Sequence, residues 1–313
     1  MKELVDFLSK NLVAEKKEPE KNINQELFHY WKKVSQENSF LFIDGGNLAL
    51  FESSGIAVHV IRVAAVLYDR EQRKRVFKKE FYSCVFAKSS GFETRTFPAQ
   101  AYCNFSIGLH DQELALPGKK VDISSINPLM RRLAELSFCR ELLSKAGCIV
   151  LDGSLETAYN KEKELMILLK EEAARQGKAV FALSKTMKML GERREFLQQL
   201  RKQEGTWAYP LRSPESYKTW IIRLHKKAKY LFRLDSCSDA IDETLSTLEM
   251  LSKDPVFPGY PYSLILADRL ARVSKQEAGM LRTQFMARMK GKWKDLELEE
   301  KEINAHAVLD RIS

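Results

Sequence analysis

The stretch Phe40-Leu41-Phe42-Ile43-Asp44-Gly45-Gly46 ends a hydrophobic run on an aspartate followed by glycine, and Cys148-Ile149-Val150-Leu151-Asp152-Gly153-Ser154 repeats this pattern. Each stretch is expected to form a buried strand that stops at its carboxylate, with glycine opening the turn beyond it. If the two strands lie side by side, Asp44 and Asp152 converge and offer oxygen ligands to a hard divalent cation. A single Asp-Gly pair, by contrast, is a common turn.

The residues around these two stretches predict alternating strands and helices. Residues 56–68 and 76–85 read as strands joined by short polar connections, so the first three strands form an antiparallel meander. Leucines at helical spacing predict a helix over 124–147, and the strand 148–152 follows it. The remaining predictions are helices at 155–176, 186–204, 238–252, 262–289 and 296–310, and strands at 179–183 and within 207–234.

This order of elements is that of the ribonuclease H-like fold, an α/β fold with a mixed sheet and flanking helices. In that fold, acidic residues come from the first strand, the first helix, the fourth strand and a late helix. The corresponding residues here are Asp44, Glu135, Asp152 and Asp268. Their joint agreement is more specific than either Asp-Gly pair alone. Two divalent cations held by such carboxylates can activate water and stabilise the leaving group in phosphodiester cleavage.

Two glutamates on the first helix are alternative candidates for the acidic residue of that element. Glu135 and Glu141 lie six residues apart, which places them on different faces of the helix. Glu135 falls among the leucines of the buried face and near the pair Arg131-Arg132, so it is preferred. A carboxylate on a buried face requires a metal or a basic partner.

Composition narrows the classes of function. The 313 residues carry a net charge of +9, which favours a polyanionic partner, nucleic acid first. Five scattered cysteines without CxxC spacing argue against a disulfide framework or a zinc ribbon. No apolar run reaches the length of a membrane span, so a soluble, cytoplasmic protein is expected. The chain has no Walker-type phosphate loop, and energy for unwinding DNA would have to come from a partner.

The chain is expected to divide into a charged helical arm at 1–38 and a nuclease domain at 39–313, with an irregular excursion at 88–122. The arm and the excursion exceed what a minimal nuclease fold needs. One or both are therefore expected to build a homodimer with a shared DNA channel, because two-fold symmetry is the commonest form of assembly.

Five segments stand out as motifs: 42–46, 150–155, 183–186, Tyr260-Pro261-Tyr262-Ser263-Leu264-Ile265-Leu266-Ala267-Asp268-Arg269-Leu270-Ala271 and His306-Ala307-Val308-Leu309-Asp310. Through these segments the chain resembles the NurA family of DNA-end-processing nucleases over about residues 39–310. The resemblance implies a manganese-dependent deoxyribonuclease, with magnesium as the alternative ion. It further implies 5′–3′ exonuclease and single-strand endonuclease activity in the repair of double-strand breaks, as a dimer beside a hexameric HerA-type ATPase. Gly46 departs from the family pattern, which commonly has serine there.

Four further residues are singled out near the acidic set. A lone helical histidine such as His306 is usually structural, but the resemblance adds contact with a metal or with the scissile phosphate. Lys185, at the end of a strand, is expected to neutralise phosphate charge. Tyr260 and Tyr262 flank Pro261 and either pack the entry of the next helix or form a base-stacking platform for DNA.

Two alternative functions stay open at this point. Ribonuclease H-like folds also serve as non-catalytic DNA-binding scaffolds, although a scaffold has no reason to keep four converging carboxylates. An RNA nuclease or a phosphatase on the same fold is the other alternative, because contacts to a 2′-hydroxyl cannot be read from one chain.

Overall fold

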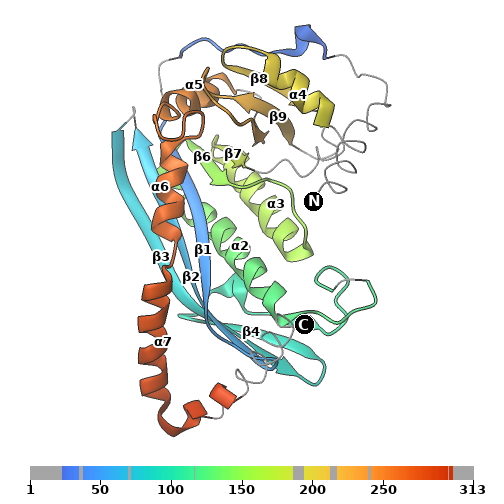
Figure 1. The fold of residues 1–313 in the computed structure, drawn as a ribbon, viewed down its shortest axis with the longest axis vertical. Helices are drawn as coiled ribbons and strands as arrows, with labels where there is room; N and C mark the ends of the chain where they lie inside the picture. Colours follow the sequence, from blue (N-terminus) through green and yellow to red (C-terminus); the bar gives the residue numbers. More distant parts are fainter. Residues whose placement is uncertain are drawn as a thin grey trace, which may run out of the picture.

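A computed structural model describes residues 23–34, 38–69, 72–115, 117–185, 194–211, 217–238, 241–294 and 296–298. Within these residues a ten-stranded mixed sheet runs in the order β5-β4-β3-β2-β1-β6-β7-β10-β9-β8 (Figure 1). The strands are β1 (Phe40–Glu52), β2 (Ile56–Asp69), β3 (Gln72–Lys88), β4 (Gly91–Phe97), β5 (Ser106–Gly108), β6 (Cys148–Asp152), β7 (Ala179–Ser184), β8 (Trp207–Leu211), β9 (Lys218–Arg223) and β10 (Phe232–Ser236). The α-helices are α2 (Ile123–Leu142), α3 (Asn160–Arg175), α4 (Arg194–Lys202), α5 (Asp242–Leu251), α6 (Tyr262–Ala271) and α7 (Lys275–Met289).

Strand β1 lies at the centre of the sheet and joins its two halves. On one side, β1, β2 and β3 form the expected antiparallel meander. On the other side, β1 pairs in parallel with β6, and β6 pairs in parallel with β7. Strand β10 then runs antiparallel to β7. The mixed sheet with flanking helices is therefore the architecture that the sequence predicted.

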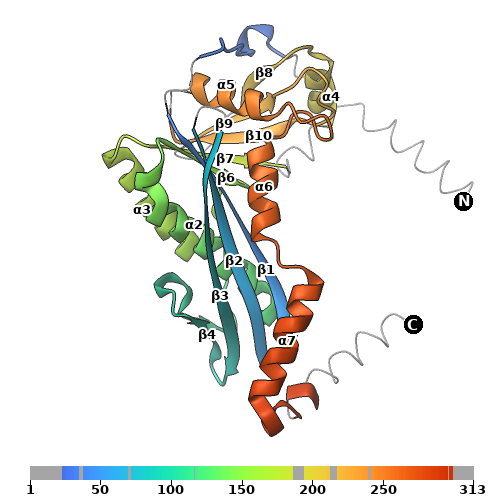
Figure 2. The ribbon, with the colours of Figure 1, turned by 90° about the vertical axis from the view of Figure 1, so that its left-hand side faces the viewer.

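Helices cover both faces of the sheet, and Figure 2 shows α2 and α3 on one side and α6 and α7 on the other. Alternation along β1 decides which core each residue joins. Leu41 and Ile43 pack in the core beneath α2 and α3, whereas Phe40 and Phe42 pack in the core beneath α5 and α6. All four side chains are at most 1% exposed, so this part of β1 is buried on both faces.

The Asp-Gly pattern predicted that the first strand stops at Asp44, but β1 continues beyond it. Strand β1 keeps its pairing with β2 as far as Glu52 opposite Ala57. Gly45 and Gly46 are extended residues of the strand, and they allow the helices to approach closely. A Cβ on Gly46 would lie 2.5 Å from the carbonyl oxygen of Ala271, at the end of α6.

Two other regions also differ from the sequence predictions. The 88–122 region contains β4 and β5, which extend the edge of the sheet, so it is not irregular throughout. Of the arm at 1–38, residues 23–34 hold a 3₁₀ turn at Gln25–Leu27 and a bridge between His29 and Ala208 instead of an α-helix. The arm contacts the sheet there, and tertiary pairing overrides local helix propensity.

The later helices keep their predicted order with shifted bounds. Helix α3 begins at Asn160 rather than near 155, because residues 153–159 form a loop in which Gly153 has a φ of +119°. The helix predicted at 262–289 is divided into α6 and α7, and Ser274 caps the second. Most of the final predicted helix, with His306, lies outside the described residues. No helix among the described residues is long and apolar enough to cross a membrane.

Candidate active site

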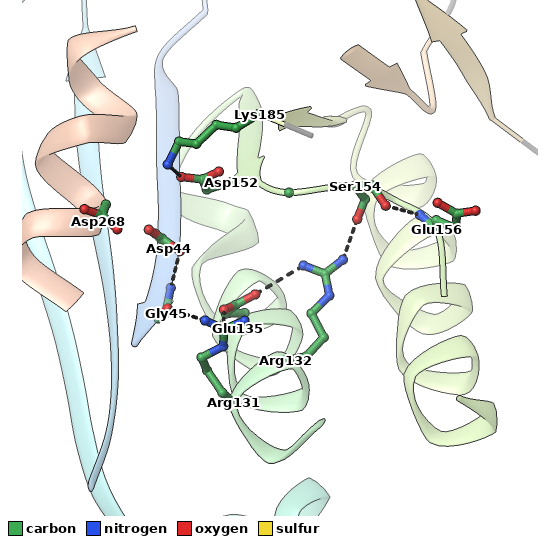
Figure 3. Close-up of a pocket in the computed structure, with 11 residues that line it drawn as sticks. Asp44, Gly45, Arg131, Arg132, Glu135, Asp152, Ser154, Glu156, Lys185 and Asp268 are labelled. Atoms are coloured by element: carbon green, nitrogen blue, oxygen red, sulfur yellow. Dashed lines mark hydrogen bonds and ion pairs between the residues drawn. The ribbon is translucent and has the colours of Figure 1, made fainter. Parts of the chain in front are cut away.

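One pocket gathers the predicted carboxylates at the point where β1 and β6 separate (Figure 3). Its lining comes from β1, α2, α6, the end of β6 and the segments that follow β6 and β7. The lining residues are Asp44, Gly45, Arg131, Arg132, Glu135, Asp152, Gly153, Ser154, Glu156, Lys185 and Asp268. The sequence named the carboxylates Asp44, Glu135, Asp152 and Asp268, and the structure brings all of them to this pocket.

Asp44 and Asp152 lie on the same face of the sheet. The parallel pairing of β1 with β6 ends at Ile43 opposite Leu151, so each aspartate is one residue beyond the last pair. Both continue the face of Phe42 and Val150, which pack in the core beneath α5 and α6. Side chains at matching positions of parallel neighbours point the same way, and the two carboxylates therefore face one space.

Glu135 reaches the pocket from the opposite layer. It lies on α2 and is only 4% exposed. Its carboxylate occupies the space next to Gly45 that a side chain would fill, since a Cβ on Gly45 would lie 2.5 Å from Glu135 Oε1. Glu141 does not reach the pocket and pairs instead with Lys79 at 2.6 Å. Of the two alternatives on this helix, only Glu135 lines the pocket.

Asp268 completes the acidic set from α6, on the side of Asp44 away from Glu135 (Figure 3). Helix α6 runs close to β1 because Gly46 leaves room for its last turn. Asp268 accepts a hydrogen bond of 2.7 Å from Arg272, one turn further along. The four carboxylates thus come from two strands and from one helix on each face of the sheet.

Basic side chains hold three of these carboxylates. Lys185 Nζ lies 2.7 Å from Asp152, and Arg132 donates to Glu135 at 3.2 Å. Arg132 also donates to Glu162 at 3.0 Å and to the carbonyl oxygen of Ser154 at 2.6 Å. Arg132 therefore ties α2 to α3 and to the loop that follows Asp152.

Asp44 differs from the other three, because the backbone N–H of Gly45, and not a basic side chain, donates to its carboxylate at 2.7 Å. Burial, followed by the charges of Asp152 and Glu135, raises the pKa of Asp44 to about 8, although the hydrogen bond from Gly45 opposes the shift. Burial also raises the pKa of Glu135, although Arg132 and Arg131 oppose that effect. The site therefore concentrates negative charge that its own basic residues only partly neutralise.

The donor set fits a hard divalent cation. Carboxylate oxygens are the ligands that magnesium and manganese prefer, and a cation would offset both the burial and the neighbouring negative charges that raise the pKa of Asp44. Each of the carboxylates of Asp152, Glu135 and Asp268 forms an ion pair with a basic side chain. Within the described part of the chain, no three carboxylate, histidine or cysteine side chains form a metal-ligand cluster in this arrangement.

The other singled-out residues have different positions. Lys185 lines the pocket as expected. Tyr260 is only 1% exposed and packs against Phe232, so its ring is not open to a base, contrary to the stacking alternative. Tyr262 is 44% exposed but does not line the pocket. His306 lies outside the described residues.

The sequence reasoning missed a buried network that holds the loop after β6. Asp235 on β10 is fully buried and accepts hydrogen bonds from Leu155 N at 3.0 Å, Arg233 Nε at 2.8 Å and Thr219 Oγ1 at 2.9 Å. Arg233 also pairs with Glu156 at 3.2 Å. The only signal in the sequence was a pair of opposite charges, Arg233 and Asp235, two residues apart in an apolar strand.

Comparison with known proteins identifies the family. A family model of the NurA domain matches residues 38–273, most of the chain. The chain belongs to the NurA family. The match confirms the resemblance drawn from the sequence motifs, and it includes all four carboxylates of the pocket. No curated protein matches the chain.

Solved structures agree with this assignment. The NurA nuclease from Sulfolobus solfataricus has a TM-score of 0.57 at 15% identity, over 92% of this chain and 97% of that chain. At that identity the likeness shows the fold, which together with the strand order confirms the ribonuclease H-like arrangement of this NurA domain. The catalytic domain of human endonuclease V matches at a TM-score of 0.44 and 8% identity, over 87% of this chain and 96% of that chain, which is too distant to carry an argument.

Proposed function

We propose that this NurA-family chain is a metal-dependent deoxyribonuclease that hydrolyses phosphodiester bonds in the pocket at the separation of β1 and β6. The observation that carries the proposal is the convergence of Asp44, Glu135, Asp152 and Asp268 from four separate elements. Rigid elements of both layers hold these carboxylates close together despite their mutual repulsion. A non-catalytic scaffold would gain nothing from that arrangement.

Asp44, Glu135 and Asp152 are the residues proposed to hold the cation, with His306 as a further ligand or phosphate contact. When bound, two manganese ions would activate water and stabilise the leaving oxygen, with magnesium as the alternative. Asp44 would be the central ligand of the set, because β1 lies in the middle of the sheet. Asp268, which is paired with Arg272, would be a weaker or conditional ligand.

The basic residues of the pocket are proposed to position the phosphate. Lys185 and Arg131 line it, and their side chains are 49% and 40% exposed. Arg131 donates weakly to the carbonyl oxygen of Gly45 at 3.4 Å, so its guanidinium lies at the wall of the site. A scissile phosphate that approaches Asp44 would meet these cations on either side. Arg132, which is half-buried between Glu135 and Glu162, would act only by holding Glu135.

The finer activities are proposed from family membership. They are 5′–3′ exonuclease and single-strand endonuclease activity on DNA ends, in double-strand break repair with a HerA-type hexameric ATPase, in the cytoplasm. A partner ATPase suits a chain that has no Walker-type motif of its own. A homodimer with a shared DNA channel is also proposed, and the net charge of +9 supports contact with DNA. Sedimentation of the full chain, and of a chain without residues 1–38, tests the dimer and the role of the arm.

The test of catalysis uses the full chain with linear duplex, circular single-stranded DNA and RNA of the same sequence. Cleavage of DNA is expected with manganese, less with magnesium, and none with calcium or in chelator. Asp44→Asn should abolish cleavage, whereas Glu164→Gln, a change on the exposed face of α3, should leave it intact. Cleavage in chelator, or an active Asp44→Asn variant, would overturn the proposal. Cleavage of RNA alone would assign an RNA nuclease instead.

A further inference from the structure

Two loops beside the site are packed tightly against each other. The β9–β10 loop covers residues 224–231, and the α5–α6 loop covers residues 252–261. Gly259 has a φ of +100°, and a Cβ placed on it would lie 2.5 Å from the Cβ of Ala228. The N–H of Gly259 donates to the carbonyl oxygen of Ser252 at 2.8 Å. The close approach at Gly259 therefore fixes the position of one loop on the other.

The outer ends of these loops present a stacked aromatic pair, which we call the Tyr230–Phe257 platform. The two ring centroids are 5.8 Å apart and the ring planes differ by 9°. Tyr230 is 55% exposed and Phe257 is 40% exposed, and the neighbouring Val256 is 90% exposed. Large apolar side chains that are exposed together indicate a binding surface, because the exposure of apolar surface to water is unfavourable.

Three lysines lie close in sequence to Tyr230. Lys226, Lys227 and Lys229 are all exposed on the same loop as Tyr230. The acidic residue nearest in sequence to Phe257 is Asp254, whose carboxylate accepts a hydrogen bond from Val256 N at 2.8 Å. An exposed ring pair beside three lysines has the chemistry of single-stranded nucleic acid recognition, in which bases stack on rings and phosphates contact cations.

Ring contacts connect the platform to the pocket. Phe257 packs edge-on against Tyr260, with ring centroids 6.2 Å apart. Lys185 Nζ lies 5.0 Å from the centroid of the Tyr260 ring and 2.7 Å from Asp152 Oδ2. The buried Tyr260 thus spans the distance between the exposed rings and the acidic site. A strand held on the platform would need only a short length of backbone to reach Asp152.

We propose that the Tyr230–Phe257 platform binds an unpaired DNA strand next to the pocket, with one base stacked on Tyr230 and the backbone held by Lys226, Lys227 and Lys229. The proposal rests on the proposed function for the choice of DNA as the ligand. It moves the base-stacking role from the buried Tyr260 to the exposed Tyr230 and Phe257. The lysines favour a polyanion over an apolar protein surface as the occupant.

The test measures binding of a short single-stranded oligodeoxynucleotide that contains 2-aminopurine, in chelator so that no cleavage occurs. Stacking quenches 2-aminopurine, so fluorescence reports stacking and anisotropy reports affinity. Tyr230→Leu with Phe257→Leu should lose the quenching and weaken binding by about tenfold or more. Tyr230→Trp should keep both. Tyr82→Leu, a change at an exposed ring on β3, is the matched control and should bind as the wild type does.

A second pair of variants tests the lysines. Lys226→Gln with Lys227→Gln should weaken binding and flatten its dependence on salt, because each lost phosphate contact releases one counterion fewer. Lys119→Gln with Lys120→Gln changes two exposed lysines of the segment before α2 and should leave the salt dependence as it was.

The outcomes separate this proposal from the proposed function. Unchanged quenching and affinity in the Tyr230 and Phe257 variant would overturn the platform and assign the patch to a protein contact. Absence of strand binding by the wild type in chelator would also overturn it, while metal-dependent cleavage would leave the nuclease proposal standing. Binding with quenching but no cleavage under any divalent cation would overturn the nuclease proposal alone.

Discussion

Glu135 enters the pocket through the space that Gly45 leaves open, since a Cβ on Gly45 would lie 2.5 Å from Glu135 Oε1. Gly45→Ala should therefore displace the carboxylate and lower nuclease activity by about 100-fold, the cost of a misplacement of about 1 Å. Gly279→Ala on α7, where nothing lies within 4 Å, is the control and should raise stability by about 0.5–1 kcal/mol. Full activity in Gly45→Ala would show that Glu135 tolerates another position.

The two glutamates of α2 make a matched pair for mutation. Glu135→Gln should abolish activity and lower the affinity for manganese, because it removes one charged ligand from the pocket. Glu141→Gln only breaks an ion pair with Lys79, in which the glutamate side chain is 46% exposed, and should change stability by at most about 1 kcal/mol. Cleavage rates and calorimetric titration of manganese measure both effects. Equal loss in the two variants would contradict the assignment of Glu135.

Asp44 should make the metal-free protein less stable as pH rises. Burial, followed by the charges of Asp152 and Glu135, raises the pKa of Asp44 from 3.8 to about 8, so the folded state keeps a proton that the unfolded state releases. The stability that this proton confers is fully present below pH 3.8 and is lost as pH rises through about 8. In chelator, Asp44→Asn should melt above the wild type, by about 2–4 °C for each kcal/mol relieved.

Calorimetry at pH 5, 6.5 and 8 measures this difference, which should widen with pH. Glu164→Gln should show no such trend. Added manganese should stabilise the wild type and leave Asp44→Asn almost unaffected, because a ligand stabilises only the state that binds it. A difference that stays constant across the pH range would refute the electrostatic origin.

The buried partner of Arg233 should matter far more than its exposed partner. Asp235→Ala would leave a buried guanidinium without its main counter-charge and should cost about 3–5 kcal/mol in the free energy of unfolding. Glu156→Gln removes the other carboxylate, which is 47% exposed, and should cost less than about 1 kcal/mol. Arg233→Met with Asp235→Leu should recover only part of the loss, because Leu155 N and Thr219 Oγ1 still lose their acceptor. Urea unfolding measures all three, and similar losses for Asp235→Ala and Glu156→Gln would refute this account.

Much of the site follows from local sequence patterns. The hydrophobic runs before Asp44 and Asp152 predict buried strands, and leucine spacing selects Glu135 over Glu141. These signals depend on residues close in sequence. The order of the elements then predicts that the four carboxylates meet, and the pocket contains all four.

The errors arise where a distant partner decides the structure. The local sequence predicts a turn at Gly45 and Gly46. In the structure the two residues belong to a continuous strand, and glycine is needed there because α2 and α6 lie too close for a side chain. The sequence left Tyr260 as either a packing residue or a stacking platform, and its contacts with Phe232 and Phe257 favour packing. The Arg233–Asp235 pair gives no local sign that it holds the loop after β6. The hydrogen bond from Leu155 N to Asp235 joins residues that are 80 positions apart.

The position of α6 has a consequence for the synthesis of the chain. Strands β1 and β6 pair although β2, β3, β4, β5 and α2 all lie between them in sequence, and α6 follows all ten strands of the sheet. Pairings between distant segments form late, after shorter-range structure. A nascent chain that ends before α6 lacks Asp268 and the layer that closes one side of the pocket. The proposed active site is therefore assembled only after α6 has left the ribosome, and the nascent chain is not expected to cleave DNA before that point.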